Sequence, residues 1–276
     1  MNKKQRKLKK KQQRTRTKSV SHQGGNGHIK TIGLSIHQRM PLWTTTGELF
    51  QPVRIYYDVL KLRKILKVFH KLRCLEFDPR YERWTWFYTG EASKITFEKR
   101  PLNPAKPIVL GWFFIRGERN LYLNVHSIER ALEAIPFFDR YLSRRSAQIT
   151  HLSVVNRLFD VSEARTFAFD HAVETHAVFE DPIQAVLQTL DTLSARVRDE
   201  REKMALIEAY LENTARKPFP EVEHLAVHYY QEGIHQPWFL LGSRQYIAIQ
   251  HWKGNTTYNH VDYIREIVGS TGEIPG

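Results

Sequence analysis

The stretch Ile108–Val125, IVLGWFFIRGERNLYLNV, decides the fold that we expect for this chain. It holds two apolar runs, Ile108–Ile115 and Leu121–Val125, on either side of five polar residues with a glycine, Arg116–Asn120. Two such runs joined by a short glycine-containing segment indicate a β-hairpin. The first run is apolar at nearly every position, which is typical of a central strand covered on both faces. The next segment, Ser127–Leu142, has a helical pattern and is expected to pack on the hairpin.

Other segments of the first half predict further strands and a basic helix. Asp58 can cap a helix that runs to about Arg73, with apolar residues at spacings of three and four. Two short runs, Cys74–Phe77 and Arg83–Tyr88, flank a turn and are expected to pair as strands. One more strand is expected within Gln148–Phe159.

From residue 182 the apolar spacing becomes helical and repeats every seven positions up to residue 213. The repeat consists of Ile183, Leu190, Val197, Met204 and Leu211. A single helix over 182–213 would be about 48 Å long. The charged stretch Arg196–Lys203 interrupts the apolar pattern, so a helical hairpin is the alternative to one long helix. Sustained heptads favour a homodimer or a protein partner on this helix, and packing inside a monomer is the other interpretation.

The C-terminal residues predict a second hairpin between two helices. Glu221–Glu232 has the pattern of a short helix, and His260–Val268 that of another. Trp238–Leu241 and Tyr246–Trp252 have the pattern of paired strands around a glycine. This order resembles the central hairpin and the helix after it, which suggests either a duplicated unit or convergence on a common motif.

These elements together predict an α+β protein: β-hairpins packed with helices, a long helix in the second half and a disordered basic N-terminal tail. Residues 1–31 form the tail, because they hold too few apolar residues to offset the entropy of ordering. Residues 32–160 form an N-terminal α+β part with the central hairpin. Residues 161–276 form a C-terminal part of helices and a β-hairpin, packed on the first part.

The net charge of +13 is concentrated at the N-terminus. Residues 1–46 contain twelve Lys and Arg and no acidic residue, which leaves 30 basic and 29 acidic residues in 47–276. Residues 47–120 carry a net charge of +7, and residues 121–276 carry −6. This asymmetry favours contact with a polyanion near the N-terminal half, although solvated surface charge would give the same count.

Two sets of residues are candidates for contact with nucleic acid. The tail offers Lys3, Lys4, Arg6, Lys7, Lys9, Lys10, Lys11, Arg14 and Arg16 for phosphates. The body offers Lys64, Lys67 and Lys71 for phosphates, with Trp84, Trp86 and Tyr88 for base stacking on one strand face. The alternatives are a solvated or membrane-surface helix for the lysines, and core packing for the three aromatic residues.

Catalytic and metal-binding motifs are absent from the sequence, so whether the protein is an enzyme stays open. His224 and His228 would share one face of a helix, with Glu221 a turn earlier, and form a weak metal site at most. We expect no cofactor. The single cysteine, Cys74, excludes an internal disulfide and favours a reducing cytoplasm, and no apolar run is long enough for a membrane span.

Three functions remain in competition. The first is a nucleic-acid-associated accessory or regulatory protein, with RNA favoured over DNA because no DNA-binding motif is present. The second is a protein–protein adaptor or oligomer that uses the helix over 182–213. The third is a metal-dependent hydrolase that uses the C-terminal histidines.

Overall fold

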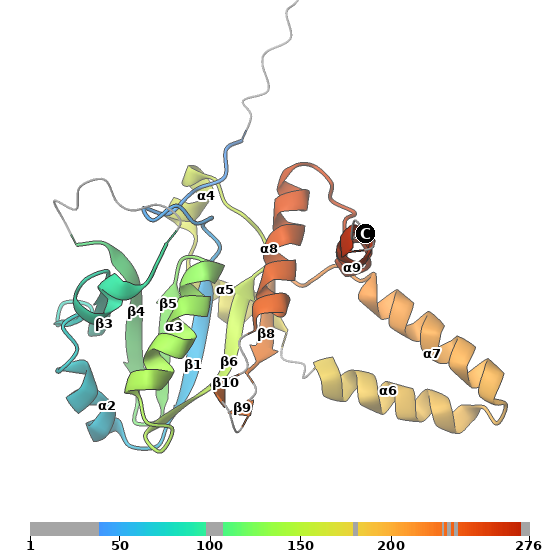
Figure 1. Ribbon diagram of the computed structural model, residues 1–276, viewed down its shortest axis with the longest axis horizontal. Coiled ribbons are helices and arrows are strands. Elements are labelled where there is room, and N and C mark those ends of the chain that lie inside the picture. The colour runs from blue at the N-terminus through green and yellow to red at the C-terminus, as the bar shows by residue number, and fades with distance from the viewer. Residues whose placement is uncertain are drawn as a thin grey trace, which may run out of the picture. The chain divides into compact units, whose positions relative to one another are not determined.

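An eight-stranded sheet organises the chain in the computed structural model (Figure 1). Its strands are β1 (Val53–Val59), β2 (Leu75–Asp78), β3 (Arg83–Phe87), β4 (Val109–Arg116), β5 (Asn120–Val125), β6 (Ala147–Val155), β7 (Ala177–Val178) and β8 (Val222–Ala226). Their order across the sheet is β2-β3-β4-β5-β1-β6-β8-β7. All neighbours are antiparallel except β7, which is parallel to β8. Two further short strands, β9 (Tyr229–Tyr230) and β10 (Gly233–Ile234), pair with each other.

The structure describes residues 39–97, 107–178, 182–227, 229–230, 233–234 and 237–271. The predicted basic tail, 1–31, lies outside these residues. The described residues from Arg39 onward belong to one compact unit, in which β6 pairs with β8. The sheet therefore contains strands from both sides of residue 160.

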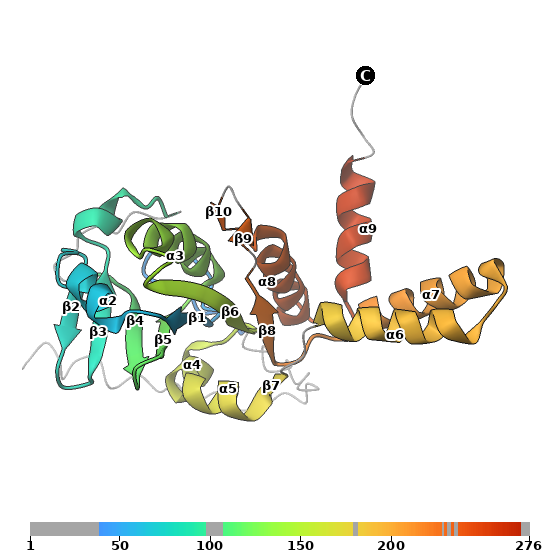
Figure 2. The same cartoon turned by 90° about the horizontal axis from the view of Figure 1, so that it is seen from below.

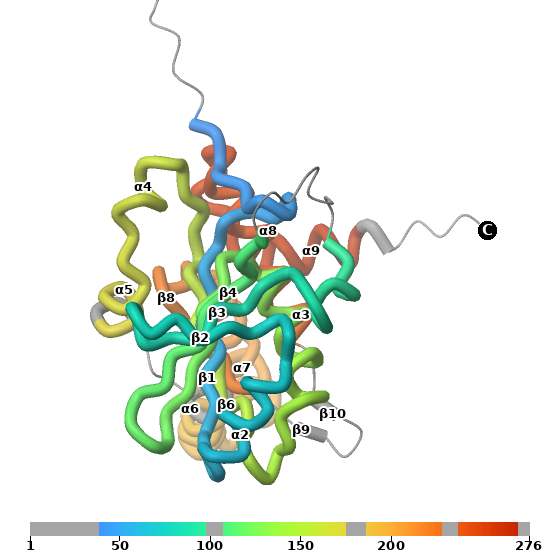
Figure 3. Tube along the Cα trace, turned by 90° about the vertical axis from the view of Figure 1, so that its left-hand side faces the viewer, coloured from blue at the N-terminus to red at the C-terminus, as the bar shows by residue number. Residues whose placement is uncertain are grey.

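Eight helices are present in the described residues, and some of them cover the two faces of the sheet. They are α2 (Leu62–Phe69), α3 (Ile128–Tyr141), α4 (Val161–Thr166), α5 (Phe169–His176), α6 (Pro182–Arg196), α7 (Glu200–Ala215), α8 (Trp238–Trp252) and α9 (His260–Thr271), with a 3-10 turn, η1, at Gly90–Lys94. Figure 2 shows α3 and α8 on one side of the sheet and α4 and α5 on the other. Figure 3, which looks from the β2 edge, shows the same separation of α3 from α4 and α5. Among the described residues, no helix is both long and apolar enough to cross a bilayer.

The α+β class is confirmed, and so are the central hairpin and the helix that follows it. β4 and β5 pair over six residue positions, and β5 lies in the middle of the sheet. α3 begins directly after Ser127, whose side chain accepts a hydrogen bond from the backbone N–H of Arg130. The predicted pair of strands near 74–88 is present as β2 and β3, and the later strand as β6.

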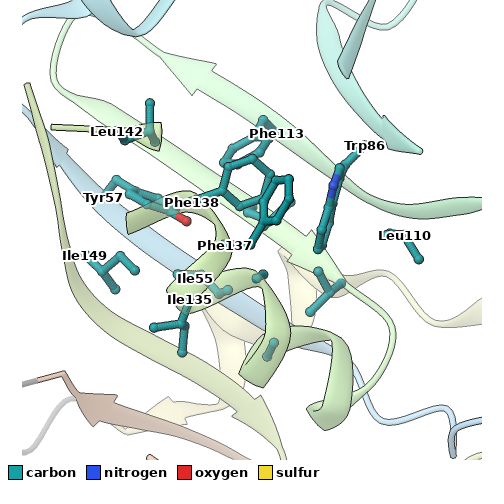
Figure 4. Close-up of a cluster of buried hydrophobic side chains, with 14 of the residues drawn as sticks. Ile55, Tyr57, Trp86, Leu110, Phe113, Ile135, Phe137, Phe138, Leu142 and Ile149 are labelled. Atoms are coloured by element: carbon teal, nitrogen blue, oxygen red, sulfur yellow. The ribbon is translucent and has the colours of Figure 1, made fainter. Parts of the chain in front are cut away.

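The main core lies between the sheet and α3 (Figure 4). Phe138 of α3 meets two rings of the sheet: its centroid is 4.7 Å from that of Phe113 and 5.0 Å from that of Trp86. Phe69 of α2 lies 4.8 Å from Phe113, so α2 packs on the same side of the sheet as α3. Aromatic residues thus fill one face of β3 and β4, and this fixes which residues point the other way.

The expected cap at Asp58 is wrong. Asp58 lies in β1, and α2 starts only at Leu62, after Lys61, whose side chain makes no capping hydrogen bond. The alternating Val53, Ile55, Tyr57 and Val59 are all buried, and this two-residue period holds the segment in a strand.

The single long helix over 182–213 is also wrong, and the alternative, a helical hairpin, is confirmed. α6 ends at Arg196 and α7 begins at Glu200, with Asp199 accepting hydrogen bonds from the backbone N–H groups of Arg201 and Glu202. A carboxylate at this position stabilises the start of a helix, because it accepts hydrogen bonds from free backbone N–H groups and lies at the positive end of the helix dipole. The break between the helices therefore falls at residues 197–199, inside the charged stretch Arg196–Lys203.

The predictions of a helix over 221–232 and of a strand hairpin over 238–252 are both wrong. The structure has a strand where the helix was expected and a helix where the hairpin was expected. Residues 222–226 form β8 on the edge of β6, and Trp238–Trp252 form one helix, α8. Leu241, Arg244 and Ala248 recur at helical spacing and are buried, and the Arg244 guanidinium lies 2.7 Å from the Glu223 carboxylate of β8. Because residues 238–252 hold no strand pair, the suggested duplication is excluded. The last predicted helix is present as α9.

Candidate nucleic-acid interface

The two faces of the sheet carry different aromatic residues. Residues of a strand point alternately to opposite faces, so the burial of Trp84 and Trp86 in the core turns Arg83 to the other face. Directly paired residues then continue this second face across five strands, because paired residues share a face. The row, in order from β3 to β6, is Arg83, Phe114, Tyr122, Tyr56 and His151.

The four rings of this series, Phe114, Tyr122, Tyr56 and His151, are here called the aromatic row. Phe114 and Tyr122 are stacked, with centroids 5.2 Å apart, and Tyr56 and His151 are stacked at 4.1 Å. The centroids of Tyr56 and Tyr122 are 6.2 Å apart. Phe114, Tyr56 and His151 are partly exposed, whereas Tyr122 is buried between its neighbours. The row is therefore a strip of aromatic rings on the face opposite the core, partly exposed at Phe114, Tyr56 and His151 and covered at Tyr122.

Arginine side chains accompany the aromatic row. The Arg83 guanidinium lies 5.0 Å from the ring centroid of Trp112, which is the next outward-facing residue of β4 before Phe114. Arg116, two residues after Phe114, is exposed. Aromatic rings interleaved with arginines are the groups that bind unpaired bases and phosphates.

Arg54 connects the row to the helix that covers the far end of this face. Its guanidinium lies 4.1 Å from the Tyr122 centroid and 4.8 Å from that of Phe169 in α5. It also donates to Asn124 Oδ1 at 2.7 Å and pairs with Asp170 of α5. Arg54 is buried, so its charge fixes the position of α5 and is not free to meet a ligand.

Two histidines lie at the β6–β8 end of the row. The Ser153 hydroxyl donates to the Tyr56 hydroxyl at 3.1 Å and lies 2.8 Å from Nδ1 of His224. Burial, and then the neighbouring His224, lower the pKa of His151 to about 4. Burial also lowers the pKa of His224. Both rings are therefore uncharged at pH 7, and they contribute hydrogen bonds and packing rather than positive charge.

The same face contains a cavity of about 570 Å³ beside the row. Its lining includes Tyr56, Tyr122 and His151, together with Arg116 and Thr150. This volume is within the range of small-molecule sites. An aromatic group, such as a base, can enter here with rings on one side and polar groups on the other.

The predicted base-stacking residues do not form an exposed face, and this is a correction. Trp84 and Trp86 are 5% and 0% exposed and belong to the core. Tyr88 is partly buried against Phe97, and its hydroxyl donates to the carbonyl oxygen of Ile95 at 2.7 Å. The predicted alternation was correct, but it placed these residues on the inner face.

The predicted phosphate-binding lysines are exposed: Lys64 and Lys67 lie in α2, and Lys71 lies in the turn after it. They lie on the side of the sheet that carries α3, since Phe69 of α2 packs on the core-facing Phe113. The structure therefore does not bring them onto the face that carries the aromatic row. The tail residues Lys3–Arg16 lie outside the described residues.

The metal hypothesis assumed a helix over 221–232, and the structure has a strand, β8, at this place. His224 lies in β8, with Nδ1 beside Ser153, and Glu221 pairs with Arg157 at 2.9 Å. His228 is outside the described residues. In the part of the chain that the structure describes, no three His, Cys, Asp or Glu side chains converge on a metal-sized site. Burial raises the pKa of Cys74 to about 12, so its thiol is a poor nucleophile.

Sequence reasoning missed the aromatic row, although a signal for it exists. In Arg54–Tyr56 and in Tyr122–Asn124, polar or aromatic residues alternate with a purely apolar one, which marks a face that is not core. In Gly111–Ile115 the outward Trp112 and Phe114 are hidden in a continuous apolar run.

No protein-family model, curated protein or solved structure matches the chain. Function is therefore inferred from the chemistry of this surface.

Proposed function

We propose that this protein binds single-stranded nucleic acid, RNA in preference to DNA, on the sheet face that carries the aromatic row. The observation that carries the proposal is the series Phe114, Tyr122, Tyr56 and His151, flanked by Arg83 and Arg116. Unpaired bases pack on aromatic side chains, and arginines hold the phosphates between them.

RNA is favoured because single-stranded RNA recognition commonly uses a sheet with aromatic residues on its open face. The row also has polar neighbours that can meet a 2′-hydroxyl, Asn120 and Thr150, both exposed. A duplex hides its bases in the stack, so it would meet only the arginines of this face. The protein would act as an accessory or regulatory factor, and a reducing cytoplasm accords with the single buried thiol of Cys74.

The direct test is the affinity of the purified full-length protein for a fluorescent single-stranded RNA of about a dozen nucleotides. Phe114→Leu removes one partly exposed ring and should weaken binding roughly tenfold, because stacking on one ring contributes about 1–3 kcal/mol per base. Phe239→Leu is the matched control, since Phe239 is 50% exposed on α8, away from the row. Equal affinities of the two variants and the wild type would exclude the row as the binding surface.

A second candidate function, a dimer or protein adaptor, is supported by the α6–α7 hairpin. Four of its apolar side chains are well exposed: Leu187, Met204, Leu206 and Leu211. Met204 and Leu211 are seven residues apart and share one face of α7, and such an exposed apolar face is a surface that a second copy or another protein can cover. The two functions use different surfaces and do not exclude each other.

A further inference from the structure

The cavity beside the aromatic row has a polar side as well as an aromatic one. Its lining includes three side chains from three neighbouring strands, Arg116 of β4, Asn120 of β5 and Asp58 of β1. These residues are directly paired, Arg116 with Asn120 and Asn120 with Asp58. Each lies two positions from a member of the row, so they point to the same face of the sheet. They form a polar row parallel to the aromatic one.

Arg116 and Asp58 are separated by one strand. Two strand spacings place their backbones roughly 9.5 Å apart. All three side chains of the polar row are exposed. The two opposite charges therefore lie at the two ends of the polar row, with Asn120 between them, and a flat ligand can lie across the row beside Tyr56.

A guanine base matches this pattern of charges. Its O6 and N7 accept hydrogen bonds at one end of its polar edge, which is the pattern that an arginine reads with two donors. Its N1–H and N2–H₂ donate at the other end, and a carboxylate such as Asp58 accepts both. Adenine would turn its amino group toward Arg116 and an unprotonated nitrogen toward Asp58. Uracil could satisfy each charged group once, through O4 and N3–H.

An irregularity in β6 places an extra residue in the lining of the cavity. The pairing of β1 with β6 shifts between Tyr56 and Tyr57, so Tyr56 pairs with His151 but Tyr57 pairs with Ile149. The extra residue, Thr150, then lines the cavity together with His151. Its hydroxyl lies 2.9 Å from Nδ1 of His151, which orients the ring that stacks on Tyr56. Bulges of this kind re-aim side chains next to binding sites.

We infer that this cavity recognises an unpaired guanine, stacked against the partly exposed Tyr56, with Arg116 at O6 and N7 and Asp58 at N1 and N2. The inference rests on the proposed function, because the base reaches the cavity as part of a single strand. Uracil is the next best of the bases considered, and adenine is disfavoured because in the same orientation it offers a donor to Arg116 and an acceptor to Asp58. The aromatic row then supplies affinity for any unpaired base, and the polar row supplies the preference for guanine.

The test measures binding of the full-length protein to short single-stranded RNAs that differ at one position. The central base of an otherwise adenine-rich strand is guanine, inosine, 7-deazaguanine, uracil or adenine. Inosine lacks the N2 amino group, and 7-deazaguanine lacks N7. The wild type should bind the guanine strand about tenfold or more tightly than the adenine strand, and each analogue should fall between them.

Two variants assign the contacts. Asp58→Asn should remove most of the difference between guanine and inosine, and Arg116→Gln most of the difference between guanine and 7-deazaguanine. Both residues are exposed, so the variants should fold. Asp191→Asn on α6 and Arg140→Gln on α3 change the same residue types elsewhere on the surface and should retain the full preference.

The outcomes separate this inference from the proposed function. If all five strands bind equally well and Phe114→Leu weakens every one, the sheet face binds single strands but the guanine pocket is wrong. If no strand binds, both are wrong. A guanine preference that survives in both Asp58→Asn and Arg116→Gln would place base recognition elsewhere and overturn the inference.

Discussion

His126 is a half-buried residue whose charge state links folding to pH. Its ring lies 4.9 Å from Phe50 and 4.9 Å from Trp112, measured between centroids. Burial, and then the charge of Arg130, lower the pKa of His126 from 6.5 to about 4. The native state keeps this ring neutral, whereas the unfolded chain takes up a proton near pH 6.5. Stability from this residue is therefore complete above pH 6.5 and is lost as the pH falls toward 4.

The expected loss from His126 between pH 7 and pH 4 is about 3 kcal/mol of unfolding free energy. Urea unfolding at several pH values measures it. His151, His224 and His260 also have lowered pKa values and add to the slope of the wild type. His126→Phe keeps a ring between Phe50 and Trp112 but cannot titrate, so its stability should fall less steeply with acid. Parallel profiles for wild type and variant would contradict the prediction.

Gly111 permits the close approach of β4 to β5. A Cβ at this position would lie 2.5 Å from the carbonyl oxygen of Asn124 and 2.9 Å from Cγ1 of Val125. Gly111→Ala should therefore cost about 1–3 kcal/mol of stability in urea unfolding. Gly242→Ala in α8 is the control, because nothing lies within 4 Å of its added Cβ, and it should stabilise the helix by about 0.5–1 kcal/mol. A Gly111→Ala protein as stable as wild type would show that β4 and β5 separate easily.

Alternation along a strand predicts which residues share a face but not which face is the core. In Arg83–Tyr88 the sequence grouped Trp84 with Trp86 correctly, and the structure buries both. Which face is buried depends on α3, through contacts such as Phe138 with Trp86. A partner so distant along the chain has no local signature, so the outward face with Arg83 was missed.

At the scale of elements, the sequence pattern predicted an element correctly where residues adjacent in the sequence stabilise that element. The β4–β5 hairpin and α3 carry a turn and a cap within the segment itself, and both were predicted. β8 instead pairs with β6, which ends 67 residues before β8 begins, and α8 is held by the Arg244–Glu223 ion pair. These tertiary contacts override weak local preferences, and there the predictions of helix and strand were reversed.

The α6–α7 hairpin should be separable from the sheet. Among the described residues, α6 and α7 contact each other and α7 contacts α9, with Glu212 4.0 Å from Arg265, but contact with the sheet is sparse. Replacing 182–215 with a short Gly/Ser linker should change the unfolding free energy by at most about 1 kcal/mol, because elements with few buried contacts contribute little to global stability. Binding to single-stranded RNA should be unchanged.

The same replacement tests the adaptor function. If the exposed Leu187 and Met204 mediate a dimer, sedimentation of the wild type should show a dimer that is absent from the shortened protein. Leu187→Glu is a milder variant that keeps the hairpin and should have the same effect. A wild type that sediments as a monomer at all concentrations would show that the hairpin does not mediate a homodimer.

At the scale of the whole molecule, positive charge and aromatic surface belong to different parts of the chain. Twelve of the 42 basic residues precede residue 47, where no acidic residue occurs. The aromatic row lies in the sheet, whose surrounding residues 47–276 are nearly neutral in total. Phosphate contacts position a nucleic acid and base contacts specify it. The proposal therefore assigns the two tasks to different parts of the same protein.

Removal of residues 1–30 should change the salt dependence of RNA binding and leave the base preference intact. Each phosphate neutralised by the tail releases condensed counterions, so about six contacts give a log–log slope of roughly −4 to −5 for the full-length protein. The truncated protein should show a flatter slope between about 50 and 200 mM salt. Phe114→Leu in the full-length protein is the complementary variant: it should lower affinity at every salt concentration without changing the slope. Equal slopes for full-length and truncated protein would show that the tail does not contact the phosphates.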